Sequence, residues 1–330
     1  MDTQARPKAT ETSVRGTGTA FGTFGELLQG VLPGGDRHFM VTFPVAAWST
    51  AVFRHSPDHD GFVVWPPHKG KAVRIAELAL AAAGRSGGGS LELSSELPEG
   101  KGMASSSADL VATVRAVGAA LGTTFDAAAI ESFLREIEPT DGVMYDEIVA
   151  YYHREAELRE GLGILPSLAI VAYDEGGQVD TIAHNRDARQ VSEADKAEYA
   201  RLLDELCGAV RARDLTAVGR VATRSSELNA AARSRRSLPE LRRICEETGG
   251  LGVACAHSGT VLGILYAADD PELTRKVGAA RAACSALPGT TTVHRSLGHG
   301  DVWSACSMEV TARDNTAPAR TASTEHAWGA

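Results

Sequence analysis

The residues best suited to chemistry lie in a glycine- and serine-rich run at positions 98–109, which reads PEGKGMASSSAD. Gly100 and Gly102 allow positive φ angles and a close approach of the backbone to a ligand. Apolar residues then recur at helical spacing, at Leu110, Val111, Val114, Val117 and Leu121. The run therefore predicts a loop that opens a buried helix, whose first N–H groups and positive dipole end bind an anion such as a phosphate. The alternative is an ordinary serine N-cap after a surface turn.

Two carboxylates, Glu138 and Asp141, flank a turn in the segment IEPTDGVMY at positions 137–145. Phosphoryl transfer uses a carboxylate to bind Mg²⁺ and often another to orient or deprotonate the attacking hydroxyl. The alternative is a turn at the C-terminal end of a helix, with Asp141 as a surface Asx-turn residue. If the loop at 98–109 binds phosphate, one of these carboxylates is a candidate ligand of the accompanying metal ion and the other a candidate proton acceptor.

The serine-rich run resembles the second motif of the GHMP kinases, the relatives of galactokinase, homoserine kinase and mevalonate kinase, which reads Pro-x-x-x-Gly-x-x-Ser-Ser-x-Ala. It is not the common P-loop, which needs Gly-Lys-Ser/Thr after a four-residue gap from its first glycine. Residues 16–30 resemble motif one, with Gly25 and Glu26 in the matching places, but Phe21 and Thr23 replace its usual proline and lysine. Residues 256–260, Ala-His-Ser-Gly-Thr, resemble motif three. By themselves these two segments are a glycine-rich hairpin and a hairpin turn with a loop histidine.

The resemblance implies a role for each of these residues. Asp141 corresponds to the acidic residue that many GHMP kinases use as catalytic base. Glu138 and Ser106 are expected to bind Mg²⁺, with Glu131 as a rival ligand upstream. The residues expected to bind the nucleotide are Pro98, Gly100, Lys101, Gly102, Met103, Ala104, Ser105, Ser106 and Ser107. Those expected to contact the substrate are Glu26, His257, Ser258 and Gly259, with Arg295 as a guess for its carboxylate.

The motif details resemble the L-threonine kinases of cobalamin biosynthesis more than other GHMP branches. Met103 and Ala104 stand where other branches have Leu-Gly, and Glu-Pro-Thr-Asp and His-Ser-Gly-Thr point the same way. The resemblance implies an ATP- and Mg²⁺-dependent kinase that converts L-threonine to O-phospho-L-threonine. The alternatives are a kinase of another hydroxy amino acid or of homoserine, and a nucleotide-binding regulator without turnover. Asn185 and Asn229 are weaker members of the same set.

Composition narrows the class of protein. The chain has 330 residues, 43% hydrophobic and 23% charged, with a net charge of −9. This composition is typical of a soluble globular protein of two domains, and the acidic balance disfavours nucleic acid and anionic membranes as partners. The five cysteines are scattered and odd in number, so neither a zinc site nor a disulfide framework is expected. We expect a cytoplasmic protein without signal peptide or membrane span, and a homodimer is compatible with the resemblance.

The order of predicted elements favours an α+β protein. Short β-prone pieces occupy 16–50, a strand 45–53, a helix 72–83, a strand 90–94 and a helix 127–137. From residue 167 onward the predicted order is β-α-β-β-α-β, that of a ferredoxin-like unit with its helices on one face of the sheet. The resemblance implies a GHMP kinase fold, with an N-terminal ribosomal-protein-S5-domain-2-like domain at 15–163 and a C-terminal ferredoxin-like domain at 164–311. Residues 1–14 and 312–330 are expected to be flexible.

Overall fold

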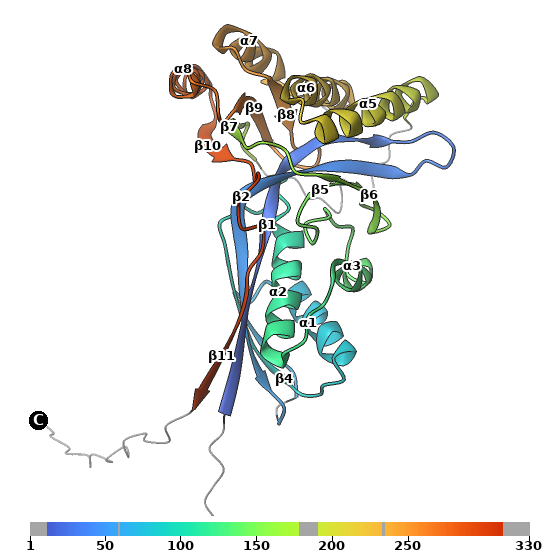
Figure 1. Cartoon of the computed structure of the whole chain (residues 1–330), viewed down its shortest axis with the longest axis vertical. Coiled ribbons are helices and arrows are strands. Elements are labelled where there is room, and N and C mark those ends of the chain that lie inside the picture. The colour runs from blue at the N-terminus through green and yellow to red at the C-terminus, as the bar shows by residue number, and fades with distance from the viewer. Residues whose placement is uncertain (1–11, 59, 178–190, 233–234, 313–330) are drawn as a thin grey trace, which may run out of the picture.

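One continuous sheet organises the molecule. The computed structural model describes residues 12–58, 60–177, 191–232 and 235–312. Within these ranges, eleven strands join in the order β10-β7-β9-β8-β1-β2-β4-β3, with β11 added on β1 and the β5–β6 hairpin added on β2. Figure 1 shows the long strands β1 and β2 running through both halves of the molecule. The two halves therefore share a backbone hydrogen-bonded framework that fixes their relative position.

The long hairpin of β1 (Thr12–Val31) and β2 (His38–Ser56) replaces the short strands expected between residues 16 and 50. Its pairing shifts register between Phe21 and Gly22, between Thr23 and Glu26, and between Glu26 and Leu28. Such bulges insert extra residues and bend a strand without ending it. The glycine-rich segment 16–30 thus lies within one long strand, and the turn of the hairpin falls between Val31 and His38.

Glycines in β1 also let helix α2 (Ser105–Leu121) lie directly on the sheet. A Cβ at Gly16 would stand 2.1 Å from the Ala116 carbonyl oxygen, and one at Gly18 would stand 2.5 Å from the Ala116 nitrogen. No side chain fits into either space. The first two glycines of the motif-one segment therefore position α2, and with it the serine-rich loop, rather than contacting a ligand.

The N-terminal half supplies three helices and several further strands. Its helices are α1 (Gly70–Ala82), α2 and α3 (Ala127–Arg135). Its further strands are β3 (Phe62–Trp65), β4 (Gly88–Ser95), β5 (Ile148–Tyr152) and β6 (Glu157–Gly163). The sequence predicted α1, α3 and β4 to within a few residues. It did not predict β3, β5 or β6. Strands β3 and β5 are only four and five residues long, and β6 is largely polar, so none of them gives a strong strand signal.

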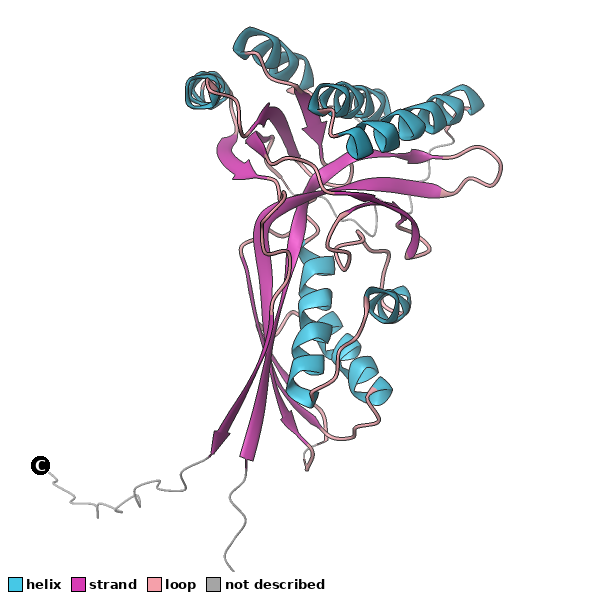
Figure 2. Cartoon of the chain, in the orientation of Figure 1, coloured by secondary structure: helices cyan, strands magenta, loops and turns pink. Residues whose placement is uncertain are grey.

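The C-terminal half has the expected β-α-β-β-α-β order. Its strands are β7 (Leu168–Asp174), β8 (Gly252–Cys255), β9 (Val261–Ala267) and β10 (Thr290–Arg295). Its helices are α5 (Glu193–Ala212), α6 (Leu215–Ala232), α7 (Leu238–Thr248) and α8 (Leu273–Ser285). The strands lie in the antiparallel order β10-β7-β9-β8, and Figure 2 shows the helices gathered along one side of them.

The predicted domain boundary falls between β6 and β7 and stays a prediction. The predicted flexible ends, 1–14 and 312–330, lie outside the described residues except for residues 12–14 and Ala312, which belong to strands. Residues 12–14 belong to β1, because strand β11 (Cys306–Ala312) returns to pair with this end of it. No helix in the described part of the chain is long and apolar enough to cross a bilayer. All five cysteines are free, and only Cys306 is exposed.

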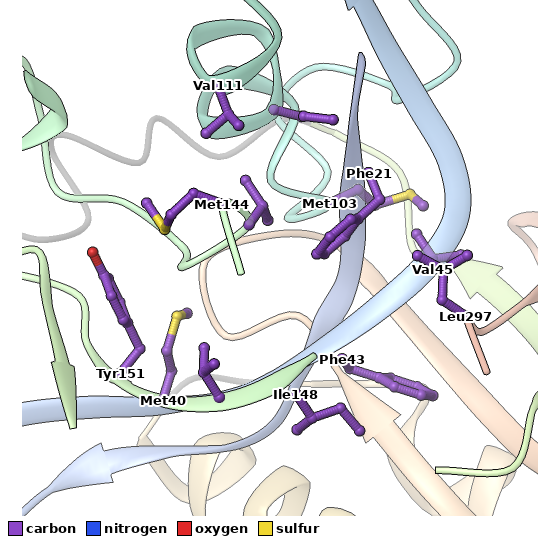
Figure 3. Close-up of a cluster of buried hydrophobic side chains, with 14 of the residues drawn as sticks. Phe21, Met40, Phe43, Val45, Met103, Val111, Met144, Ile148, Tyr151 and Leu297 are labelled. Carbon is purple, nitrogen blue, oxygen red and sulfur yellow. The ribbon is translucent and has the colours of Figure 1, made fainter. Parts of the chain in front are cut away.

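A buried cluster fills the space where the hairpin crosses between the halves. Figure 3 shows Met40 beside Tyr151 and Ile148, with Phe43, Val45 and Leu297 on the same crossing. Met40 and Tyr151 are register partners on β2 and β5. Because Met40 and Met103 also line the cavity of the candidate active site, the core forms part of the wall of that site.

Candidate active site

A cavity of about 680 Å³ lies where the serine-rich loop, the carboxylate turn and the long hairpin meet. Its wall includes Glu26, Ser258 and most of the loop from Gly100 to Ser107. It also includes Glu138 and Asp141, which come from the segment between α3 and β5. Residues from all three motif-like segments and from the carboxylate turn therefore face one space.

The serine-rich loop has the backbone geometry of an anion site rather than of a serine cap. Gly100 has φ +70° and Gly102 has φ +80°, as their residue type predicts. The N-cap of α2 is Ala104, itself at φ 56°, and no side chain caps the helix. The alternative of an ordinary serine N-cap is therefore wrong. The three serines form the first helical turn, whose amides precede the first intrahelical bond, from Ala108 N to Ala104 O.

Backbone contacts lock the three motif-like segments together. The Gly25 N–H donates to the Gly102 oxygen at 3.0 Å, and the Thr260 N–H donates to the Lys101 oxygen at 3.2 Å. A Cβ at Gly259 would lie 1.9 Å from that Lys101 oxygen. The glycine at 259 is thus required by the close approach of two loops, and the glycine at 102 faces the same junction.

Ser106 and Ser107 connect the loop to the carboxylate turn. The Ser106 hydroxyl donates to Glu138, which also pairs with Lys71. The Ser107 hydroxyl donates to Asp141 Oδ2 at 2.9 Å. The tertiary structure thus brings both candidate carboxylates onto the first turn of α2, where anions and metal-bound phosphates are stabilised.

Asp141 has the electrostatic character of a proton acceptor. Desolvation by burial, assisted by the negative charge of Glu26, raises the pKa of Asp141 to about 7. The hydrogen bond from Ser107 acts in the opposite direction, and the charge of Glu138 adds a smaller increase. A carboxyl group whose pKa lies near neutrality is well matched to general base catalysis. This environment does not fit a surface Asx-turn residue.

Two lysines that the sequence analysis did not single out, Lys69 and Lys71, line the cavity. Lys69 Nζ lies 2.7 Å from Asp109 Oδ2 and also contacts Glu99. Lys71 contacts Glu138. Both lie in the Lys-Gly-Lys sequence at the start of α1, which was the available signal. Although Thr23 stands where motif one usually has a lysine, the cavity wall still carries the positive charges of Lys69 and Lys71.

Glu26 is held in the cavity wall by the motif-three turn. The His257 N–H donates to Glu26 Oε2 at 3.0 Å, and His257 Nδ1 lies 2.9 Å from the same oxygen. His257 Nε2 lies 3.1 Å from the Ser225 hydroxyl on α6. Glu26 pairs in register with Thr42 on β2 and with Cys255 on β8, so it stands where the sheet passes between the halves. His257 thus orients a cavity carboxylate, while Ser258 lines the cavity itself.

Other predicted residues take positions away from the cavity. Glu131 is buried and accepts hydrogen bonds from Tyr145 OH at 2.7 Å and from the Leu158 N–H at 3.1 Å. The Lys101 side chain pairs with Asp174 at 2.7 Å, so its charge faces β7. Arg295 pairs with Asp301 at 2.7 Å, at the end of β10.

These contacts commit each side chain to a structural partner. Arg295 is not among the residues that line the cavity, and its substrate-binding role stays a prediction. The weaker candidate Asn229 accepts a bond from Arg235 at 3.2 Å, and Asn185 lies outside the described residues.

Comparison with known proteins decides the family. The family model for the GHMP kinases N-terminal domain matches residues 70–153, and that for the GHMP kinases C-terminal domain matches residues 206–286. The chain belongs to the GHMP kinases. It is therefore a kinase, and the predicted two-part α+β fold of this family is confirmed. The serine-rich loop and the carboxylate turn at 138–141 both fall within the first matched span.

Individual relatives of this GHMP kinase agree with the branch suggested by its motifs. It is 27% identical over 243 residues to an L-threonine kinase of Citrobacter freundii, covering 73% of this chain and 83% of the relative. It is 25% identical over 258 residues to an L-threonine kinase of Salmonella typhimurium, covering 77% and 84%. In fold it is similar to a homoserine kinase from Cytophaga hutchinsonii, with a TM-score of 0.68, 16% identity and coverage of 94% and 100%. The resemblance to the threonine kinase branch is thus confirmed.

Proposed function

We propose that this GHMP kinase transfers the γ-phosphoryl group of ATP to the side-chain hydroxyl of L-threonine, giving O-phospho-L-threonine and ADP. The curated relatives named L-threonine kinase support this substrate, and they align over most of their length. The observation that carries the proposal is Asp141, a carboxyl group with a pKa raised to about 7 beside the first turn of α2. This observation supports Asp141 as a proton acceptor beside a helix end that would bind phosphate.

The loop and its lysines would hold the nucleotide phosphates. The amides of Ser105, Ser106 and Ser107 precede the helical hydrogen-bond ladder of α2, so they can donate to phosphate oxygens along the helix dipole. Lys71, at the start of α1, would add a positive charge near the transferred group. Catalysis of phosphoryl transfer rests mainly on such positioning and charge stabilisation.

Ser106 and Glu138 fit a magnesium ion. Mg²⁺ prefers oxygen ligands and is usually held by one or two carboxylates together with substrate phosphates. The ion pair between Glu138 and the ammonium group of Lys71 shows that this carboxylate faces positive charge. When bound, Mg²⁺ would neutralise charge on the phosphate oxygens.

Asp141 would orient the substrate hydroxyl and accept its proton as the oxygen attacks the γ-phosphorus. The bond between that phosphorus and the bridging oxygen of ATP breaks, and ADP leaves with the electron pair. The charge of Glu26, which raises the pKa of Asp141, makes it a stronger base once it is deprotonated. Ser107 keeps the carboxylate aligned through both of its contacts with Asp141.

The test is an ADP-release assay with a panel of L-threonine, L-serine, L-allothreonine and L-homoserine. We expect the highest kcat/KM with L-threonine and detection of O-phospho-L-threonine by mass spectrometry. A preference for homoserine would keep the phosphoryl-transfer reaction and change the identity of its substrate. The similarity in fold to a homoserine kinase is the reason for including this alcohol. ADP release with none of these alcohols would favour a nucleotide-binding regulator.

A further inference from the structure

A second group of polar side chains lines the cavity on the face of β1, β2 and β5. Gln29 pairs in register with Met40, and Met40 pairs with Tyr151, so these residues share one face of the sheet. His153 and Arg154 follow directly after β5. Gln29, Thr140, His153 and Arg154 all line the same cavity as Asp141. The mechanism above uses none of these four.

Three of these side chains bury polar atoms that lack a protein partner. Within the described part of the chain, Thr140 Oγ1, His153 Nδ1 and Gln29 Oε1 are buried and make no hydrogen bond. Thr140 is only 1% exposed and His153 only 6%. Buried polar atoms are nearly always satisfied, since an unsatisfied one costs about 1–3 kcal/mol. Their gathering around one cavity indicates a ligand that supplies the missing partners.

The backbone fixes this group beside the proposed base. The Thr140 N–H donates to the His153 oxygen at 3.1 Å, which ties the carboxylate turn to the end of β5. Thr140 directly precedes Asp141, and consecutive Cα atoms stand about 3.8 Å apart. A ligand bound to Thr140 with one group can therefore reach Asp141 with a group on a neighbouring carbon.

The charges in the cavity complement a zwitterion. Arg154 is the cation of this group, and burial lowers its pKa, so an anionic ligand would stabilise it. Burial also lowers the pKa of His153 to about 3, with further lowering by His38 and Arg154, so its imidazole is neutral. Glu26 supplies a carboxylate in the same cavity. A guanidinium is well shaped to bind a carboxylate through two parallel hydrogen bonds, and Glu26 with Gln29 Oε1 suits an ammonium group.

We propose that Arg154, with the Thr140 hydroxyl and His153 Nδ1, binds the substrate carboxylate and makes this kinase select 2-amino-3-hydroxy acids over amino alcohols. The inference rests on the proposed function and deepens it. In such a substrate neighbouring carbons carry the carboxylate and the hydroxyl, which suits the adjacent positions of Thr140 and Asp141 in the cavity wall. The ammonium group would then lie toward Glu26 and Gln29.

The experiment compares L-threonine with 1-amino-2-propanol, which is threonine without its carboxylate, in the wild type and in Arg154→Met. We expect the KM for L-threonine to rise at least 30-fold in the variant, with KM for ATP and for 1-amino-2-propanol changing less than threefold. Arg154→Lys should lie between, because it keeps the charge and loses the paired hydrogen bonds. Arg159→Met is the matched control, since Arg159 lies on the same hairpin and pairs with Glu160.

Thr140→Val gives a second test that does not depend on removing a charge. Because Thr140 Oγ1 makes no hydrogen bond within the described part of the protein, we expect unchanged or higher thermal stability and a KM for L-threonine raised about tenfold.

An unchanged KM for L-threonine in folded Arg154→Met would overturn the inference while leaving the threonine kinase proposal intact. If the wild type instead prefers another hydroxy amino acid, the proposed substrate fails, and the same variants assayed with that acid still test the carboxylate site.

Discussion

Ser107 and Asp141 hold each other where the serine-rich loop meets the carboxylate turn. The Ser107 hydroxyl donates to Asp141 Oδ2 at 2.9 Å. In return, the Asp141 N–H donates to Ser107 Oγ at 3.3 Å. The two residues are 34 positions apart in the chain, so only the fold pairs them. Because Ser107 belongs to the first turn of α2, the proposed base keeps a fixed place relative to the N-terminal end of this helix.

Asp141→Asn should lower kcat by roughly 10² to 10⁴ and leave ATP affinity nearly unchanged, because the lost proton acceptor acts mainly in the transition state. Asn can still accept the hydrogen bond from Ser107, so the loop should keep its shape. Steady-state kinetics and nucleotide titration check both parts. Wild-type kcat in this variant would remove Asp141 from the mechanism.

The rate should depend on pH through Asp141. Its pKa is raised from 3.8 to about 7, so the carboxyl is protonated and inactive as a base below that pH. We expect kcat/KM for the alcohol to rise with pH and level off above about 7. The residual rate of Asp141→Asn should lack this rise. A profile that stays flat from pH 5.5 to 8 in the wild type would contradict the assignment.

The same raised pKa predicts an opposite trend for stability. Between pH 3.8 and about 7 the folded protein keeps a proton on Asp141 that the unfolded chain releases. This carboxyl therefore lowers the free energy of unfolding as pH rises through that window, by at most about 1.4 kcal/mol per pH unit. From pH 5 to pH 8, the free energy of unfolding of Asp141→Asn should increase relative to that of the wild type, as measured by chemical denaturation. If this difference shrank as the pH rose, the pKa of Asp141 would not be raised in the folded protein.

Glu138→Gln and Glu131→Gln should separate the two candidate metal ligands. Glu138 lines the cavity beside Ser106, so its loss should raise the Mg²⁺ concentration needed for half-maximal activity about tenfold or more. Glu131 bonds to Tyr145 and Leu158, so its variant should lose thermal stability and keep its Mg²⁺ requirement. Titration of Mg²⁺ at saturating ATP distinguishes them, and a reversed pattern would assign the metal to Glu131.

Ser106→Ala should weaken ATP-dependent turnover at least tenfold, equivalent to about 1.4 kcal/mol, with the fold intact. Gly102→Val is the poorer test, because a Cβ at Gly102 would lie 2.4 Å from Ala256 Cβ and the residue has φ +80°. Strain at that junction should lower stability as well as activity. Circular dichroism with ATP kinetics checks both variants, and unaltered kinetics in Ser106→Ala would mean that this hydroxyl is not a ligand.

The sequence by itself determined the chemistry-bearing segments and the order of elements after residue 167. Local signals sufficed there, since glycines at positive φ, helical periodicity and short buried strands depend on neighbouring residues. The first half was less predictable. The glycines of β1 suggested turns because the helix that they pack against, α2, lies about a hundred residues further along the chain. The close approach of a helix produces no periodic pattern in the sequence of the strand.

Only the tertiary structure decided which polar residues meet. It placed Arg154, Gln29 and Thr140 in one cavity with Asp141, and it directed Arg295 and Lys101 to other partners. It also brought Lys71, at the start of α1, into contact with Glu138. The physical reason is that the charge and hydrogen bonding of a side chain depend on groups brought near by long-range strand pairing and helix packing. Such pairing is a property of the whole chain, and no local pattern encodes it.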